Sequence, residues 1–177
     1  MSVYHPTTAV ITGQEALDLM VSILQRYDVG HLALNGEDYP YVIPLNHTYH
    51  EGKIFLHGSI TGKKVELMER CPRACYGVYG TQSPAIKEGV VLRSCSKDYQ
   101  SVLCYGNIRV HRGSEEWRKY LGAFASDYSH KPPEHTEADN TSCYVMDLVE
   151  MTARIAFHPA PKVIYTYKFP SSSTGGY

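Results

Sequence analysis

The chain has 177 residues, of which 43% are hydrophobic and 20% are charged, as is usual for one globular domain. Its formal net charge of −1 gives no bulk electrostatic reason to expect binding to nucleic acid or to an anionic membrane. No apolar stretch approaches the roughly 20 residues that span a bilayer, and the first residues lack the basic start of a signal peptide. We therefore expect a cytoplasmic protein with a single domain over residues 1–169.

The first predicted element is a helix over about 13–26. Thr12 stands three residues before Glu15, which is the spacing of a capping box at a helix start. Apolar residues then recur at helical spacing, at Ala16, Leu17, Met20, Ile23 and Leu24. The pattern ends near residues 28–30, where we expect the helix to stop.

Three strands are predicted next, over 31–34, 41–49 and 53–57. Asn35-Gly36 is a hairpin signal between the first two strands, and Glu51-Gly52 forms the turn between the second and third. Loops of two to four residues would make these three strands antiparallel neighbours.

The apolar pattern then changes to a short helix over 63–69, which Pro72 stops because the residue before a proline avoids helical geometry. A strand is predicted over 74–79. Residues 80–98 contain glycine, proline and serine, and we interpret them as a loop with one extended piece over 89–93.

A long strand is predicted over 99–111, and a helix begins at Ser114 with acidic residues in its first turn. The apolar face of that helix would consist of Trp117, Tyr120, Leu121 and Phe124. A polar loop follows over 127–141, and a final long strand over 143–157. The tail, 170–177, is rich in serine and glycine and is expected to be disordered.

Six or so strands with three short helices predict an α+β fold. Short connections make most of the strands antiparallel, and so we expect a barrel-like sheet with short flanking helices. The sequence contains no internal repeat and no sign of a second domain.

Cysteine and tyrosine usage are both informative. Five cysteines form an odd count without a Cys-x-x-Cys pair, which favours reduced thiols in a cytoplasmic protein. Fifteen tyrosines stand beside four phenylalanines and one tryptophan. Tyrosine favours strands and half-wet interfaces, and it stacks on flat ligands, so the excess is compatible with a dimer surface.

The stretch 55–64 is the strongest candidate for a binding site. A strand ends there, a turn of small residues follows, and a helix starts with two lysines. Free N–H groups at a helix start attract anions, and hydroxyls and ammonium groups strengthen that attraction. The residues that supply these groups are Ser59, Thr61, Lys63 and Lys64. The same pattern is also compatible with an ordinary helix start and solvated lysines.

Other catalytic and metal-binding motifs receive little support. His47 and His50 lie three apart in a predicted strand, so they should point to opposite faces and not share a metal. The sequence has no Gly-x-Ser-x-Gly elbow and no Gly-x-Gly-x-x-Gly after a strand. His57, at a strand end beside the anion-binding turn, is the candidate for proton transfer, or else an ordinary packing residue.

These segments resemble the FMN-binding split barrels related to pyridoxamine 5′-phosphate oxidase, and most of all the nitroimidazole-resistance (Nim-type) branch. The resemblance covers about residues 12–157. It is carried by Gly30-His31-Leu32-Ala33-Leu34 with Tyr39 to Asn46, by Ile54-Phe55-Leu56-His57-Gly58 with Gly62-Lys63-Lys64 and Arg70-Cys71-Pro72-Arg73, and by Tyr99 to Leu103 with Tyr105-Gly106.

The resemblance implies a six-stranded split barrel that binds FMN in a groove between the subunits of a homodimer. It places the flavin phosphate at Ser59, Thr61, Lys63 and Lys64, with Lys64 matching the lysine of a Gly-x-Lys element. It places the ring along Ile43, Pro44, Leu45 and Asn46. It also brings Tyr99, Ser101 and His57 near the cofactor.

The resemblance has a limit that bears on substrate. The tryptophan and arginine that hold the substrate phosphate in pyridoxamine phosphate oxidases have no clear match, so we do not expect that reaction. We expect a flavin-dependent reductase that passes electrons from reduced FMN to a small acceptor such as a nitro compound. Two alternatives stay open: a split barrel that binds haem or another tetrapyrrole, and a flavin-binding protein without turnover.

Overall fold

The computed structural model describes residues 7–80, 99–112, 141–156 and 162–170. Statements about the structure below concern these ranges. The predicted extended piece over 89–93, the helix from 114, the loop over 127–141 and the tail over 170–177 fall outside them, apart from end residues.

Within these ranges the chain forms two helices and eight strands. In chain order they are β1 (Thr7–Ile11), α1 (Gln14–Leu24), β2 (Val29–Leu34), β3 (Tyr41–His50), β4 (Lys53–Ser59), α2 (Lys63–Arg70), β5 (Arg73–Gly80), β6 (Tyr99–His111), β7 (Thr141–Ala156) and β8 (Lys162–Lys168).

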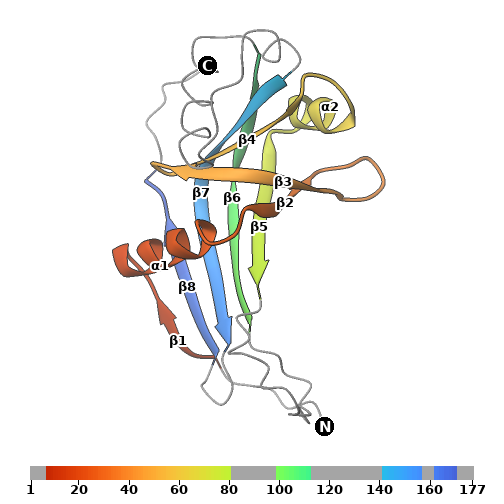
Figure 1. The fold of residues 1–177 in the computed structure, drawn as a ribbon. Coiled ribbons are helices and arrows are strands. Elements are labelled where there is room, and N and C mark those ends of the chain that lie inside the picture. Colours follow the sequence, from red (N-terminus) through yellow and green to blue (C-terminus); the bar gives the residue numbers. More distant parts are fainter. Residues whose placement is uncertain (1–6, 81–98, 113–140, 157–161, 171–177) are drawn as a thin grey trace, which may run out of the picture.

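Six of the strands close into an antiparallel barrel. Their order is β7-β4-β3-β2-β5-β6, and β6 pairs back to β7 to complete the circle. The 16-residue β7 also pairs with β8, and β1 pairs in parallel with β8, so these two strands extend the sheet outside the barrel (Figure 1). The predicted α+β fold with a six-stranded split barrel is confirmed.

The predicted meander of β2, β3 and β4 is present, with two different turns. Glu51 and Gly52 join β3 to β4 with φ angles of 45° and 77°, as the tight type I′ hairpin requires. The connection from β2 to β3 spans residues 35–40, so the expectation of a two- to four-residue loop at Asn35-Gly36 was wrong. Asn35 is occupied elsewhere, because its side-chain amide donates to the carbonyl of Arg73 at 3.1 Å.

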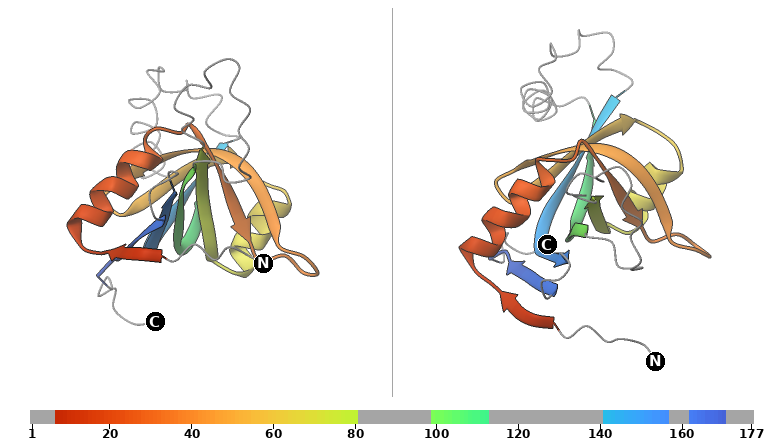
Figure 2. Two further views of the ribbon diagram at one scale, coloured as in Figure 1. Left: turned by 90° about the horizontal axis from the view of Figure 1, so that it is seen from below. Right: turned by 60° about the horizontal axis from the view of Figure 1, so that its bottom comes forward.

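The two helices cover different parts of the barrel (Figures 1 and 2). The buried face of α1 packs on the side of β6, β7 and β8, whereas α2 packs against β6 and β2. Both helices add side chains to one hydrophobic core, namely Ala16, Met20, Ile23 and Leu24 from α1 and Val65, Leu67 and Met68 from α2. Burying their apolar faces attaches both helices firmly to the sheet.

The start of α1 differs from the prediction. Gly13 is the N-cap residue, with φ 78°, and no side chain caps the helix. Thr12 therefore lies one position too early for its hydroxyl to reach the N–H groups of the first turn, and Glu15 is the second helical residue instead of the third. The predicted capping box does not form.

Two negative findings apply to the described residues. Neither helix there is long and apolar enough to cross a lipid bilayer. Their four cysteines, Cys71, Cys75, Cys104 and Cys143, are all free thiols.

Candidate functional site

An interruption in the sheet lies between β3 and β4. These strands pair only from His47–Leu56 to His50–Lys53. In the described structure, residues 41–46 of β3 continue along β2 alone, and residues 57–59 of β4 continue along β7 alone. The facing sides of both segments are thus strand edges, which leave backbone hydrogen-bonding groups open to a ligand.

The start of α2 follows directly on this edge of β4. Gly62 is the N-cap, with φ 106° and no capping side chain. The N–H groups of Val65 and Glu66 both donate to the carbonyl of Gly62, at 2.9 and 3.2 Å. The N–H groups of the preceding residues, Lys63 and Lys64, point out of the helix start, and this positive end of the helix attracts an anion.

The two lysines at this helix start have different surroundings. The ammonium of Lys63 lies 5.6 Å from the ring centroid of Tyr41, a cation–π contact that connects α2 to the start of β3. Cε of Lys64 lies 3.2 Å from the place that a Cβ of Gly58 would occupy, so the Lys64 stem lies over that glycine. Neither ammonium forms an ion pair with a carboxylate of the described residues.

Gly58 leaves room on the inner face of β4. A Cβ there would also lie 3.0 Å from the hydroxyl of Tyr144. That hydroxyl donates to the carbonyl of Ser59, and burial raises the pKa of Tyr144 to about 12, so it stays protonated. The sequence reasoning missed Tyr144 and Tyr41. Strand alternation signals only that they point inward, and it does not indicate that they face α2.

The hydroxyl of Ser59 accepts a hydrogen bond from the N–H of Thr61 at 3.3 Å, which shapes the turn before α2. Both residues are exposed. The structure therefore places Ser59 at the end of β4, Thr61 in the connection that follows, and Lys63 and Lys64 at the start of α2.

His57 points away from Gly58, because successive residues of a strand face opposite sides of the sheet. Across the ladder it lies opposite Cys143, which in turn lies opposite His111. Burial raises the pKa of Cys143 to about 12, whereas loss of solvent lowers the pKa of His57 below its ordinary 6.5. His57 thus adjoins the same edge of β4 as Lys64, but on the other face.

The predicted ring-binding stretch of β3 alternates in the same way. Ile43 and Leu45 pack against the core, whereas Pro44 and Asn46 are exposed on the outside of the barrel. The stretch faces the edge of β4 across the interruption described above.

Tyr99 and Ser101 lie at the start of β6. Ser101 pairs with Arg154 of β7, whereas His57 pairs with Cys143, eleven residues earlier on the same strand (154 − 143). This offset follows one coiled strand of a closed barrel and is not the distance between the two side chains. Around the other side of the barrel, Ser101 stands opposite Tyr79, and Val29 stands opposite Asn46, whose segment of β3 faces the edge of β4 that carries His57.

The barrel exterior carries a set of exposed apolar side chains, which we call the outer wall. Its members come from neighbouring strands β3, β2, β5 and β6, and they are Val42, Val29, Tyr79, Leu103 and Tyr105. The side chain of Leu103 lies over Gly77, with Cδ2 only 2.7 Å from the place that a Cβ of Gly77 would occupy. The ring of Tyr99 lies 6.2 Å from that of Tyr79 and extends the wall toward Ser101.

His47 has a structural role in the core. Its ring nitrogens lie 3.2 Å from the Leu24 carbonyl and 2.9 Å from the Tyr76 hydroxyl. The Tyr76 hydroxyl also donates to the carbonyl of Leu45 at 2.7 Å. His50 is exposed on the opposite face, as predicted. No group of three metal-ligating side chains occurs within the described ranges.

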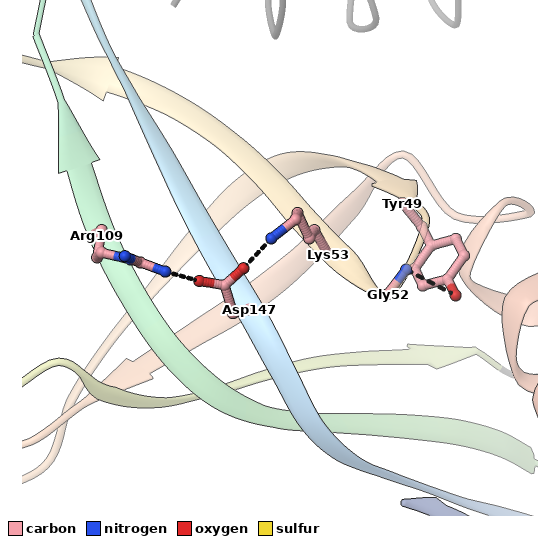
Figure 3. Close-up of polar contacts among 5 residues, drawn as sticks. All are labelled: Tyr49, Gly52, Lys53, Arg109 and Asp147. Atoms are coloured by element: carbon pink, nitrogen blue, oxygen red, sulfur yellow. Dashed lines mark hydrogen bonds and ion pairs between the residues drawn. The ribbon is translucent and has the colours of Figure 1, made fainter. Parts of the chain in front are cut away.

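Asp147 neutralises two other cations on the barrel exterior (Figure 3). Burial works to raise its pKa, but hydrogen bonds and charge from Lys53 and Arg109 outweigh burial and hold the pKa below its ordinary value. Beside it, the hydroxyl of Tyr49 accepts from the N–H of Gly52 in the β3–β4 turn (Figure 3). These cations are occupied by a carboxylate, in contrast to Lys63 and Lys64.

Comparison with known proteins identifies the family. The sequence profile named pyridoxamine 5′-phosphate oxidase matches residues 18–155, which include the barrel, α2 and the interruption between β3 and β4. The chain belongs to this family. A search of curated proteins finds no match.

Several solved structures share the fold at low sequence identity. A candidate 5-nitroimidazole antibiotic resistance protein from Bacteroides thetaiotaomicron is 23% identical, with a TM-score of 0.65, over 77% of this chain and 81% of that one. The flavocytochrome Anf3 from Azotobacter vinelandii is 16% identical, with a TM-score of 0.66, over 89% and 79%. The FAD and haem binding protein from Mycobacterium smegmatis is 18% identical, with a TM-score of 0.66, over 84% and 73%.

Proposed function

We propose that the protein binds FMN, with the flavin phosphate at the start of α2. The observation that carries the proposal is the donor set at this turn. The outward N–H groups of the helix start directly follow the exposed residues Ser59 and Thr61, and the stem of Lys64 lies over Gly58, which has no side chain. A dianionic phosphate offers only acceptors and negative charge, so the residues fit this group.

The rest of the cofactor would lie along the interruption between β3 and β4. Ile43, Pro44, Leu45 and Asn46 border it on β3, and His57 borders it on β4. A ligand at the edge of β4 can meet residues of both faces, so Lys64 and His57 can serve one cofactor from opposite sides of the strand. The resemblance of these segments to FMN-binding proteins supports this assignment.

We further propose that the site is completed by a second copy of the chain. Tyr99 adjoins the apolar outer wall through its ring contact with Tyr79, and Ser101 stands directly opposite Tyr79 on the neighbouring strand. If two copies pack through this wall, residues of one copy can meet the flavin of the other. Exposed tyrosine, leucine and valine side chains suit such an interface.

Bound FMN supplies the electron chemistry, while the protein binds and orients it and excludes competing reactions. We propose that the electrons pass to a small acceptor, with nitro compounds as the first class to test, because one structural relative is named for 5-nitroimidazole resistance. His57 is the proposed proton donor to that acceptor. Its side chain lies at the edge of β4, where the cofactor would lie.

The bound ligand tests the proposal directly. We expect purified protein to show the absorption spectrum of an oxidised flavin, and the ligand released by acid to have the mass of FMN. FAD or haem as the released ligand would contradict the proposal, and both groups appear in the names of structural relatives. Anaerobic mixing of the reduced protein with a nitroimidazole then separates turnover from flavin storage.

A further inference from the structure

Two buried hydroxyls in the described structure have no hydrogen-bond partner. They are Oγ1 of Thr48 and Oγ of Ser142, whose residues are 4% and 0% exposed. A buried hydroxyl without a partner destabilises the folded state, so each such group calls for a functional or structural explanation. Only Ser142 lies beside the proposed phosphate site.

Ser142 is positioned by the ladder between β4 and β7. It stands directly opposite Gly58, and directly opposite residues of an antiparallel pair share a face with their Cβ atoms about 4.5–5.5 Å apart. The vacant Cβ position of Gly58 is 3.2 Å from Cε of Lys64. Ser142 therefore lies on the face of β4 that Lys64 covers.

The other hydroxyl on this face is already used. Tyr144 donates its proton to the carbonyl of Ser59, so it cannot donate the same proton to a ligand. Ser142 has its proton available, and it is screened from solvent next to the flexible stem of Lys64. A lysine stem has several rotatable bonds, and the ammonium can move toward an anion at the start of α2.

We propose that Ser142 is a phosphate-binding residue, whose hydroxyl donates to the phosphate of FMN once the end of Lys64 moves off Gly58. This inference rests on the proposed function. The hydroxyl would add a short neutral donor to the charge of Lys64 and to the N–H groups of α2. Gly58 suits this role, because a side chain there would separate Ser142 from the turn.

The test compares FMN with riboflavin, which lacks the phosphate, by fluorescence titration. We expect Ser142→Ala to weaken FMN binding about ten-fold and to leave riboflavin affinity unchanged. We also expect the urea midpoint of the cofactor-free protein to stay the same or to rise, because an unsatisfied buried hydroxyl is removed. A residue with only a structural role would not produce this combination.

Thr48→Val is the matched control, since it removes the second unpartnered hydroxyl at a site away from α2. It should affect the urea midpoint in the same direction and leave both flavin affinities unchanged. Equal FMN affinity in wild type and Ser142→Ala would overturn the role of Ser142, as would an equal loss for FMN and riboflavin. Failure of the wild type to bind either flavin would overturn the proposed function itself.

Discussion

Lys63 and Lys64 are neighbours in sequence but contact different groups, and this difference predicts unequal effects on cofactor binding. The ammonium of Lys63 is held over Tyr41, whereas the stem of Lys64 lies over Gly58 beside the helix start. We expect Lys64→Ala to weaken FMN binding ten-fold or more, a loss of roughly 1.5–3 kcal/mol for one charge-assisted contact. Lys63→Ala should weaken it less. Fluorescence titration of both variants checks the order, and wild-type affinity in Lys64→Ala would remove this turn from the phosphate site.

His57 should affect turnover more than cofactor binding. We expect His57→Ala to retain FMN and to slow acceptor reduction per bound flavin by roughly 10²-fold. Loss of solvent lowers the pKa of His57 below 6.5, so its protonated fraction falls as pH rises through a value lower than that of free histidine. Wild-type turnover should therefore decrease with rising pH over that acidic range, and the variant should lack this dependence. Unchanged turnover with an unchanged pH profile would exclude His57 as the acid.

The same pKa has a consequence for stability, with a definite sign. Because the folded state holds the His57 proton less tightly than the unfolded chain, the unfolded state binds protons first as pH falls. The stability contribution of neutral His57 is thus present above about pH 6.5 and is lost as pH falls toward the lowered pKa. As pH falls below about 6.5, the urea midpoint of wild type should therefore decrease relative to that of His57→Gln. A difference between the two midpoints that does not change with pH would contradict this prediction.

Gly30 is required by the packing of Tyr76. A Cβ at Gly30 would lie 2.4 Å from the Tyr76 ring. Tyr76 is fully buried, and its hydroxyl is hydrogen-bonded to the Leu45 carbonyl and to His47. We expect Gly30→Ala to destabilise the fold by about 1–3 kcal/mol, the usual cost of overpacking a core. Urea denaturation measures this change. In a Tyr76→Leu background, where the ring is absent, the same substitution should cost much less, and an equal cost would show that the ring is not the cause.

At the scale of elements, the start of α1 gives a direct test of the corrected helix cap. Thr12→Ala should change the free energy of unfolding by less than about 0.5 kcal/mol, whereas a true N-cap threonine would cost about 0.5–2 kcal/mol. Gly13→Ala should cost about 1–3 kcal/mol, because φ 78° with ψ −160° is a backbone conformation essentially confined to glycine. Thermal or urea unfolding of the two variants shows which residue caps the helix. A larger loss of stability for Thr12→Ala than for Gly13→Ala would indicate that the capping box forms after all.

The elements that sequence reasoning found are those with strong local patterns. β2, β3, β4 and α2 each combine apolar periodicity with a turn or stop signal, so their positions were predicted within a few residues. β1 and β8 were missed. β1 has five residues and pairs in parallel with a strand about 150 residues away, so its partner leaves no local signal. β8 has alternating apolar residues at Val163, Tyr165 and Tyr167. It pairs with β7 outside the six-stranded barrel that the sequence pattern suggested.

The candidate site was predictable in part for the same reason. Ser59, Thr61, Lys63 and Lys64 lie within residues 59–64, so composition and position within the chain sufficed to group them. Gly58, Tyr144 and Ser142 form a cluster only through the pairing of β4 with β7, more than 80 residues apart in sequence (142 − 58 = 84). Sequence alone specifies neither this register nor which face of β4 the Lys64 stem covers.

At the scale of the whole molecule, the exposed apolar outer wall predicts a homodimer. Tyr99 and Ser101 both adjoin this wall at Tyr79, Tyr99 by a ring contact and Ser101 by strand pairing. Two copies that pack through this wall bury it and supply each flavin with residues from both chains. We expect light scattering at micromolar concentration to give about twice 19.9 kDa.

A charge in the wall should separate the copies and empty the site together. Leu103 is 39% exposed, so Leu103→Lys can leave the fold of one subunit intact while it places an unpaired ammonium in the interface. We expect this variant to be monomeric and to lose FMN. Val10, which is 61% exposed on β1 away from the wall, provides the control, because Val10→Lys should stay dimeric and retain FMN. A folded monomer of Leu103→Lys that binds FMN as tightly as wild type would show that one chain suffices for the site. The partner's Tyr99 and Ser101 would then have no place in it.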